Sequence, residues 1–195
     1  MFPCRSLRER EAANVPGTDS IVLTLEDLRA IAQWAADCAD RVLPMFESVA
    51  VNAARAREAI EAARTFAGGG KRTARIRSVA LAAFAAAREI EEPAVRAAAR
   101  SAGLAASSAY THPLASIDQA KHVLGPAVYA ALARDLASGA AAADEEIKWA
   151  IRKASPNVRE IMRRFPKHSA GRTRLATLYH QLDSGLRSDF GLKNP

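Results

Sequence analysis

The sequence predicts an all-α protein, and three observations lead to this fold class. Alanine, which has the highest intrinsic helix propensity, accounts for 45 of the 195 residues. Apolar residues recur at steps of three and four between Pro and Gly, which is the pattern of helices with one buried face. No segment alternates with period two in the manner of a strand. We therefore expect a compact bundle of about eight mostly antiparallel helices and no sheet.

The first helix is predicted from its cap. Thr24 can serve as the N-cap residue, with Glu26 and Asp27 in the first turn, where the helix dipole favours negative charge. One apolar stripe then runs to Leu43. Pro44 kinks or ends this helix, because proline cannot donate the backbone hydrogen bond that an interior position requires.

The remaining helices are predicted between clear stop signals. The glycines at 68–70 end one helix, Pro93 suits the first position of another, and Pro113 prevents simple continuation. Ser116 can cap a helix that contains a kink at Gly125-Pro126. The other predicted helices cover about 53–67, 73–91, 93–110, 141–154, 156–165 and 172–187.

Length and charge indicate how the chain is organised. Residues 1–20 have no apolar periodicity and are predicted to be a flexible N-terminal arm, and residues 21–195 are predicted to form one helical domain. The part from 148–195 has 11 basic and 3 acidic residues, whereas the first 147 residues have 17 basic and 18 acidic ones. The basic excess therefore lies in this last part, where it either attracts an anionic partner or keeps a helical face soluble.

The cellular compartment follows from what the sequence lacks. Cys4 and Cys38 are too few for a disulfide framework and suit a reducing environment. The opening residues have no apolar signal-peptide segment, and the longest apolar run, Val79–Ala87, is far too short to span a bilayer. We expect a cytoplasmic protein with no membrane partner. Its oligomeric state is not predicted.

A junction between two Ala-rich helices is the first candidate site. Tyr110, His112 and His122 lie close to it, and we expect them to come together because Pro113 forces a turn. Alternatively, the junction is a buried, hydrogen-bonded structure that holds the angle between the helices.

The chemistry of this junction is open. His112 and His122 have the residue type for a general base or for metal ligands, so an enzyme or a metal-binding protein remains an alternative. No third ligand completes a zinc set, and 67–73 lacks the spacing of a phosphate-binding loop. We therefore predict no catalytic residue, no metal and no cofactor.

Arginines suggest two anion sites. Arg57 and Arg64 share a helix face that can clamp a carboxylate or phosphate, or form a structural network with Asp37, Asp40 and Glu61. A candidate nucleic-acid face lies near the C-terminus, because basic side chains at helical spacing can follow a phosphate backbone. It comprises Arg159, Arg163, Arg164, Lys167, Arg172 and Arg174.

Three segments carry a family resemblance. They are Leu25–Glu47 with its block WAADCADRVLP, Arg55–Phe66 and Pro93–Tyr129. Within about 22–137 the chain resembles a bacterial family of small, Ala-rich, all-helical immunity proteins, with a less specific similarity in SPNVREIMRRFP and GRTRLATLYHQLD.

The resemblance implies a non-catalytic binding protein whose partner is another protein, a toxin encoded nearby. Its sequence blocks also assign residues of two neighbouring helices to the candidate pocket at the junction, which then comprises Trp34, Arg57, Tyr110, His112 and His122. The family pattern often has His where this chain has Phe84, Leu104 and Tyr110, so His112 and His122 are the histidines that remain in this region. A nucleic-acid-binding accessory protein that uses the basic C-terminal helices is the alternative function.

Overall fold

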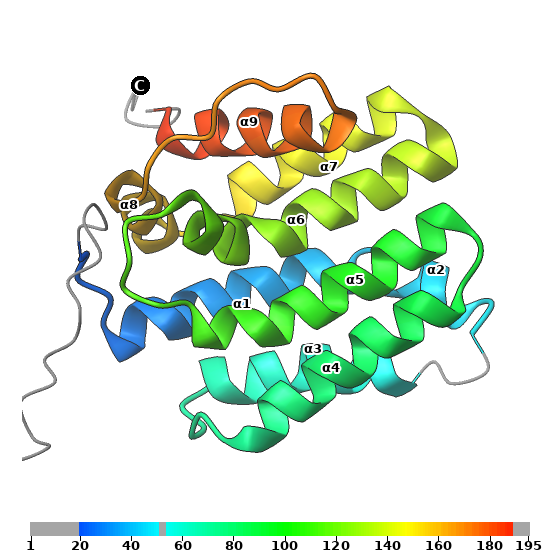
Figure 1. Ribbon diagram of the computed structural model, residues 1–195, viewed down its shortest axis with the longest axis horizontal. Helices are drawn as coiled ribbons and strands as arrows, with labels where there is room; N and C mark the ends of the chain where they lie inside the picture. Colours follow the sequence, from blue (N-terminus) through cyan, green and yellow to red (C-terminus); the bar gives the residue numbers. More distant parts are fainter. Residues whose placement is uncertain (1–19, 51–53, 189–195) are drawn as a thin grey trace, which may run out of the picture.

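The computed structural model describes residues 20–50 and 54–188, and this part of the chain is all-α (Figure 1). Its helices are α1 (Leu25–Asp40), α2 (Leu43–Glu47), α3 (Ala54–Ala67), α4 (Ala74–Glu89), α5 (Pro93–Ser107), the 3-10 helix η1 (Ser108–Tyr110), α6 (Ile117–Ser138), α7 (Ala140–Lys153), α8 (Pro156–Arg164) and α9 (Arg174–Arg187). The described residues contain no strand, only one isolated bridge between Ser20 and Leu114. The all-α prediction is confirmed. The predicted flexible arm lies, except for Ser20, outside the described residues.

The helices stack in layers around α5 (Figure 1). The hairpin partners α3 and α4 cover one side, α1 and α5 form the middle, and α6, α7 and α9 cover the other side. Helix α5 contacts α1, α2, α3, α4 and α6. Its sequence explains this central position, because alanines on almost every side allow neighbouring helix axes to approach closely.

Two buried clusters supply the larger apolar side chains. One lies where α1, α3 and α4 meet the helices α6–α9 and includes Phe66, Leu124 and Met162. The other lies between α1, α2, α3 and α5 and includes Phe46 and Ile60. All five are almost completely buried, and they fill the space that the alanine side chains leave between helices.

Two prolines have different outcomes. Pro44 ends the predicted first helix, so Leu43–Glu47 becomes the separate helix α2 and the described residues hold nine α-helices instead of about eight. Pro126 lies inside α6, which continues through it. Proline cannot donate to the carbonyl oxygen of His122 one turn earlier, but the buried Ser101 hydroxyl donates to the Pro126 carbonyl oxygen at 2.7 Å and ties α5 to α6.

Thr24 caps α1, as its position in the sequence predicts. Thr24 Oγ1 accepts from the Asp27 N–H, and Asp27 Oδ2 accepts from the Thr24 N–H, both at 3.0 Å. Arg164 of α8 donates to the same Asp27 oxygen at 3.0 Å. Burial raises the pKa of the Asp27 carboxyl, but the hydrogen bonds from Thr24 and Arg164 outweigh it and hold that pKa below its usual value. The cap therefore also anchors α8.

Candidate functional site

A pocket of about 210 Å³ brings together three of the residues that the sequence singles out, Tyr110, His112 and His122. It lies between α4, the end of α5 and the start of α6. The α4 side contributes Leu81 and Phe84, together with Arg77 and Ala80, and Ser107 comes from α5. The turn after η1 places His112 against α6, because the His112 N–H donates to Gln119 Oε1 at 2.8 Å.

Tyr110 forms the aromatic wall of this pocket. Its hydroxyl donates to the Thr73 carbonyl oxygen at 2.7 Å, which fixes the ring against the start of α4. The guanidinium carbons of Arg77 and Arg72 lie 4.8 and 5.5 Å from the ring centroid. These distances fit cation–π contacts, so the ring holds two positive charges at the edge of the pocket.

The histidines are close enough to affect each other electrostatically. Burial lowers the pKa of His122, the nearby His112 lowers it further, and Asp118 opposes both effects. His122 is therefore mostly neutral at pH 7, and His112 is exposed. Among the described residues, no group of three or more His, Cys, Asp or Glu is arranged to hold a metal ion. The arrangement can accept or donate hydrogen bonds to a partner.

Trp34 and Arg57 lie away from this pocket. Trp34 is buried between α1 and α7, and its Nε1 donates to the Ala150 carbonyl oxygen at 2.9 Å. Arg57 lies on α3, where its Nε donates to Glu47 Oε1 at 2.8 Å. Trp34 and Arg57 therefore do not line this pocket, contrary to the prediction. The sequence blocks that contain them do not indicate which face of α1 or α3 meets the junction.

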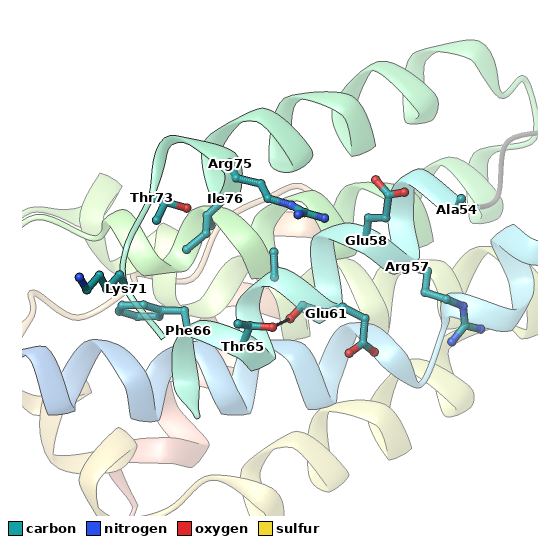
Figure 2. Close-up of a pocket in the computed structure, with 11 residues that line it drawn as sticks. Ala54, Arg57, Glu58, Glu61, Thr65, Phe66, Lys71, Thr73, Arg75 and Ile76 are labelled. Carbon is teal, nitrogen blue, oxygen red and sulfur yellow. Dashed lines mark hydrogen bonds between the residues drawn. The ribbon is translucent and has the colours of Figure 1, made fainter. Parts of the chain in front are cut away.

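A larger groove of about 520 Å³ runs between α3 and the start of α4 (Figure 2). Arg57 and Glu58 line it from α3, and Arg75 lines it from α4. Figure 2 shows Arg75 extending across the groove toward α3. The sequence analysis missed this groove. The sequence does contain a signal for this groove: one face of α3 is charged, and basic residues lie at the start of the next helix.

Arg64 takes part in a structural ion-pair network instead of an anion clamp. Its guanidinium lies 3.0 Å from Asp40 Oδ2 and 3.1 Å from Glu61 Oε1, so it joins α1 to α3. Arg57 is outside this network, since it pairs with Glu47. Asp37 is also outside it and lies 3.6 Å from Lys153 Nζ of α7.

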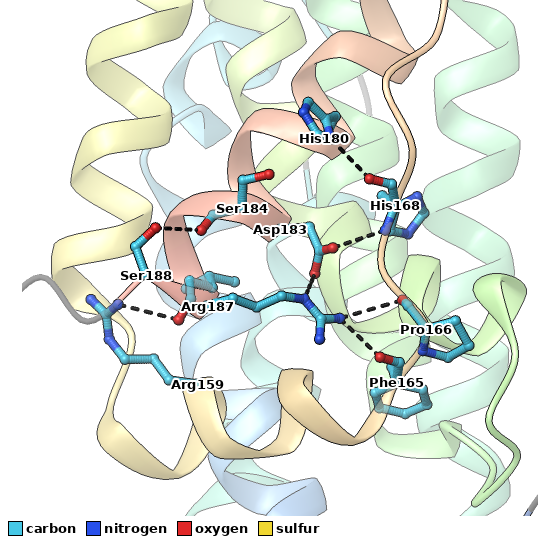
Figure 3. Close-up of polar contacts among 10 residues, drawn as sticks. Arg159, Phe165, Pro166, His168, His180, Asp183, Ser184, Arg187 and Ser188 are labelled. Carbon is cyan, nitrogen blue, oxygen red and sulfur yellow. Dashed lines mark hydrogen bonds and ion pairs between the residues drawn. The ribbon is translucent and has the colours of Figure 1, made fainter.

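Arg159, the first residue of the predicted nucleic-acid face, bonds to carbonyl oxygens of its own chain. It donates to the Ile151 carbonyl oxygen. It also donates to the Leu186 carbonyl oxygen at 3.5 Å, near the end of α9 (Figure 3). Arg187 behaves similarly, because it donates to the Phe165 carbonyl oxygen at 3.0 Å and pairs with the buried Asp183 at 2.8 Å (Figure 3). These bonds attach α9 to α8 and to the loop that follows α8.

The other basic residues of this set lie at separate places. Arg164 pairs with Asp27 at the start of α1, and Arg174 pairs with Asp135 at 2.8 Å at the start of α9. The start and end of α9 are about 20 Å apart at 1.5 Å per residue. Arg163 lies 3.4 Å from Glu160, whereas Lys167 and Arg172 are exposed in the loop. The six residues do not form one continuous cationic face.

Leu81 is the residue at the first pocket that the sequence analysis overlooked. It lies off the buried stripe of α4 and is 62% exposed beside Phe84 and Tyr110. A large apolar residue on the wrong side of an amphipathic stripe is a signal that the sequence does contain. Phe84 and Tyr110 line the same pocket as Leu81.

No helix in the described part of the chain is long and apolar enough to cross a membrane. Neither the curated proteins nor the solved structures contain a significant match to this chain. Residues 22–157 match the family described as "Imm-5 like putative immunity protein". This segment spans α1–α7 and includes both the first pocket and the α3–α4 groove. The chain therefore belongs to the Imm-5-like immunity protein family.

Proposed function

We propose that this chain is a non-catalytic, cytoplasmic binding protein that binds and neutralises a protein toxin. The observation that carries the proposal is the family match over 22–157, which covers most of the chain. The pocket chemistry agrees with it, because a tyrosine, an exposed leucine and a neutral histidine suit contact with another protein and include no activated nucleophile.

The contact surface that we propose is centred on the pocket beside α4. Leu81 is exposed next to the Tyr110 ring and the Arg77 guanidinium. Tyrosine and arginine are enriched among the residues that dominate binding energy, and burying an exposed leucine removes apolar surface from water. A partner side chain that enters the pocket would cover all three groups.

Charge indicates the chemistry of the partner. Lys71 and Arg72 lie just before α4, and Arg75 and Arg77 lie in its first turn. No ion pair joins any of these four to a carboxylate of the described residues. A toxin surface with Asp and Glu side chains would satisfy these groups and would be attracted by their field.

The test is co-expression with the product of the neighbouring gene. If that product is a toxin, growth in its presence should depend on this chain, and the two purified proteins should form a complex. Leu81→Asp should abolish protection and weaken binding at least about tenfold, because a carboxylate would be buried against an apolar surface. The matched control is Leu136→Asp, at a leucine that is 49% exposed on α6 and about 21 Å along that helix from His122.

Two results would overturn the proposal. One is a toxin that kills cells equally well with and without this chain, with no complex between the purified proteins. The other is an equal loss of protection in the two leucine variants, which would move the contact surface away from α4. Replacing His112 and His122 by Gln then separates roles: weaker binding indicates contact, and lower thermal stability alone indicates a structural junction.

A further inference from the structure

A further cavity, of about 310 Å³, lies between α6 and the N-terminus of α9. Thr173 and Ala176 line it at the first turn of α9, and Lys121 and Tyr129 line it from α6. Backbone N–H groups of a first helical turn point outward along the axis, and Thr173 Oγ1 accepts only that of Ala176, at 3.2 Å. The cavity therefore lies at the positive end of a 14-residue helix.

His168 forms the inner wall of this cavity and is only 8% exposed. Its ring stacks on Tyr179, with the ring centroids 5.1 Å apart. The backbone on both sides is held firmly: the His168 N–H donates to Asp183 Oδ2 at 2.9 Å, and its carbonyl oxygen lies 2.8 Å from His180 Nδ1 (Figure 3). The ring is thus fixed in place by its neighbours.

The ring nitrogen Nε2 of His168 is buried and has no hydrogen-bond partner among the described residues. Buried polar atoms are nearly always satisfied, so an orphaned ring nitrogen in a cavity wall indicates a missing partner. A neutral imidazole with its proton on Nε2 donates a hydrogen bond, and a ligand oxygen in the cavity would accept it.

The charges around the cavity favour an anion. Lys121 is its one lysine, and no acidic residue is among the described residues that line it. Lys121 also pairs with the exposed Asp118 at 3.0 Å, but an exposed ion pair of this kind is weak and leaves the ammonium group able to turn. Asp183, the nearest carboxylate to His168, is already paired with Arg187.

We propose that this cavity binds a small oxyanion, a phosphate or carboxylate group, between His168 Nε2, Lys121 and the N-terminus of α9. The inference does not rest on the immunity function, because His168 and α9 lie beyond the matched residues 22–157. Toxin binding and anion binding can fail independently.

The test is a titration of the full chain with inorganic phosphate, and separately with acetate, at constant ionic strength and neutral pH. Amide resonances of Ser169 and Ala176 report the binding. We expect saturable shifts, and a dissociation constant about tenfold higher in Lys121→Gln and His168→Phe, because each removes a donor to the anion. His168→Phe keeps an aromatic ring stacked on Tyr179.

Lys148→Gln is the matched control, since Lys148 also pairs with an acidic residue three positions earlier, at 2.8 Å, but lies on α7 and is not among the residues that line the cavity. It should bind the anion as the unmodified chain does. If His168→Phe does not fold, Lys121→Gln still tests the proposal, because Lys121 is exposed and its replacement leaves the core intact. Phosphate without acetate binding would identify a phosphate site, and the reverse a carboxylate site. Absence of saturable shifts with both anions, or equal affinity in Lys121→Gln and Lys148→Gln, would overturn the proposal.

Discussion

Glu146 is a charged side chain in the core, only 3% exposed. Its Oε1 lies 2.5 Å from Arg41 Nε, and its Oε2 lies 3.7 Å from Arg134 Nε. The Arg41 guanidinium also stacks 4.2 Å from the Trp149 ring centroid. One buried carboxylate therefore organises two arginines and a tryptophan where α1, α6 and α7 meet.

We expect Glu146→Ala to lower the free energy of unfolding by about 1–2 kcal/mol. The change removes the counter-charge of two arginines, but their side chains are 35% and 38% exposed and stay partly hydrated. Urea denaturation measures this change. Glu145→Ala is the control: Glu145 is exposed and pairs only with Lys148, so its loss should cost less than about 0.5 kcal/mol. Equal effects of the two variants would show that burial does not strengthen the Glu146 contacts.

His122 predicts a pH dependence of stability. Burial, and then the charge of His112, lower the pKa of His122 in the folded chain below the ordinary value of 6.5. Well above pH 6.5 the His122 ring is neutral in both the folded and the unfolded chain, so the free energy of unfolding does not depend on its protonation. As the pH falls further, the unfolded chain takes up the proton first, so the free energy of unfolding decreases until the pH reaches the folded-state pKa.

Thermal unfolding at several pH values between about 7 and 5 tests this sign. His122→Gln should reduce the loss of stability on acidification but not abolish it, because burial also lowers the pKa of His168. A variant that loses stability as steeply as the unmodified chain would contradict the assignment to His122.

At the scale of single elements, the helix caps differ in a way that can be measured. Thr24 has a full capping box with Asp27, whereas Thr73, the N-cap residue of α4, makes no side-chain capping bond. Thr24→Ala should cost about 1 kcal/mol, and more if it also weakens the Asp27–Arg164 pair. Thr73→Ala should cost only a few tenths of that, because the Tyr110 hydroxyl bonds to its carbonyl oxygen, which alanine keeps. Urea denaturation of each variant measures the loss in the free energy of unfolding. A larger loss in Thr73→Ala than in Thr24→Ala would contradict this prediction.

At the scale of the whole molecule, the core depends on helices beyond the matched family segment. Leu178, Leu182 and Leu186 of α9 are fully buried against α6, α7 and α8. Each contributes about 2 kcal/mol of burial, and the sum is comparable to the 5–15 kcal/mol by which a typical domain is stable.

A chain that stops before α9, at Thr173, should therefore lose cooperative folding. Circular dichroism during heating should show a broad transition instead of a single steep one, and the exposed core of α6 and α7 should bind an apolar dye. A truncated chain that unfolds as sharply and at the same temperature as the full one would mean that α1–α8 form an independent domain.

Much of the fold could be read from local signals. The capping residues Thr24 and Ser116, Pro93 at a first helical position and the glycines at 68–70 all lie at helix ends, as their chemistry predicts. The proximity of Tyr110, His112 and His122 was also predictable, because a single proline turn separates them. Such features depend on neighbours within a few residues along the chain, which the sequence contains directly.

The sequence by itself determined the all-α class, most of the helix boundaries and the junction of two histidines and a tyrosine. Only the tertiary structure decided that Trp34 is buried against α7, that Arg57 pairs with Glu47, and that the C-terminal arginines bond to separate parts of the chain. The physical reason is that helical periodicity specifies which side chains share a face but not which other helix that face meets. That choice depends on how side chains of distant segments fill the common core and satisfy each other's charges.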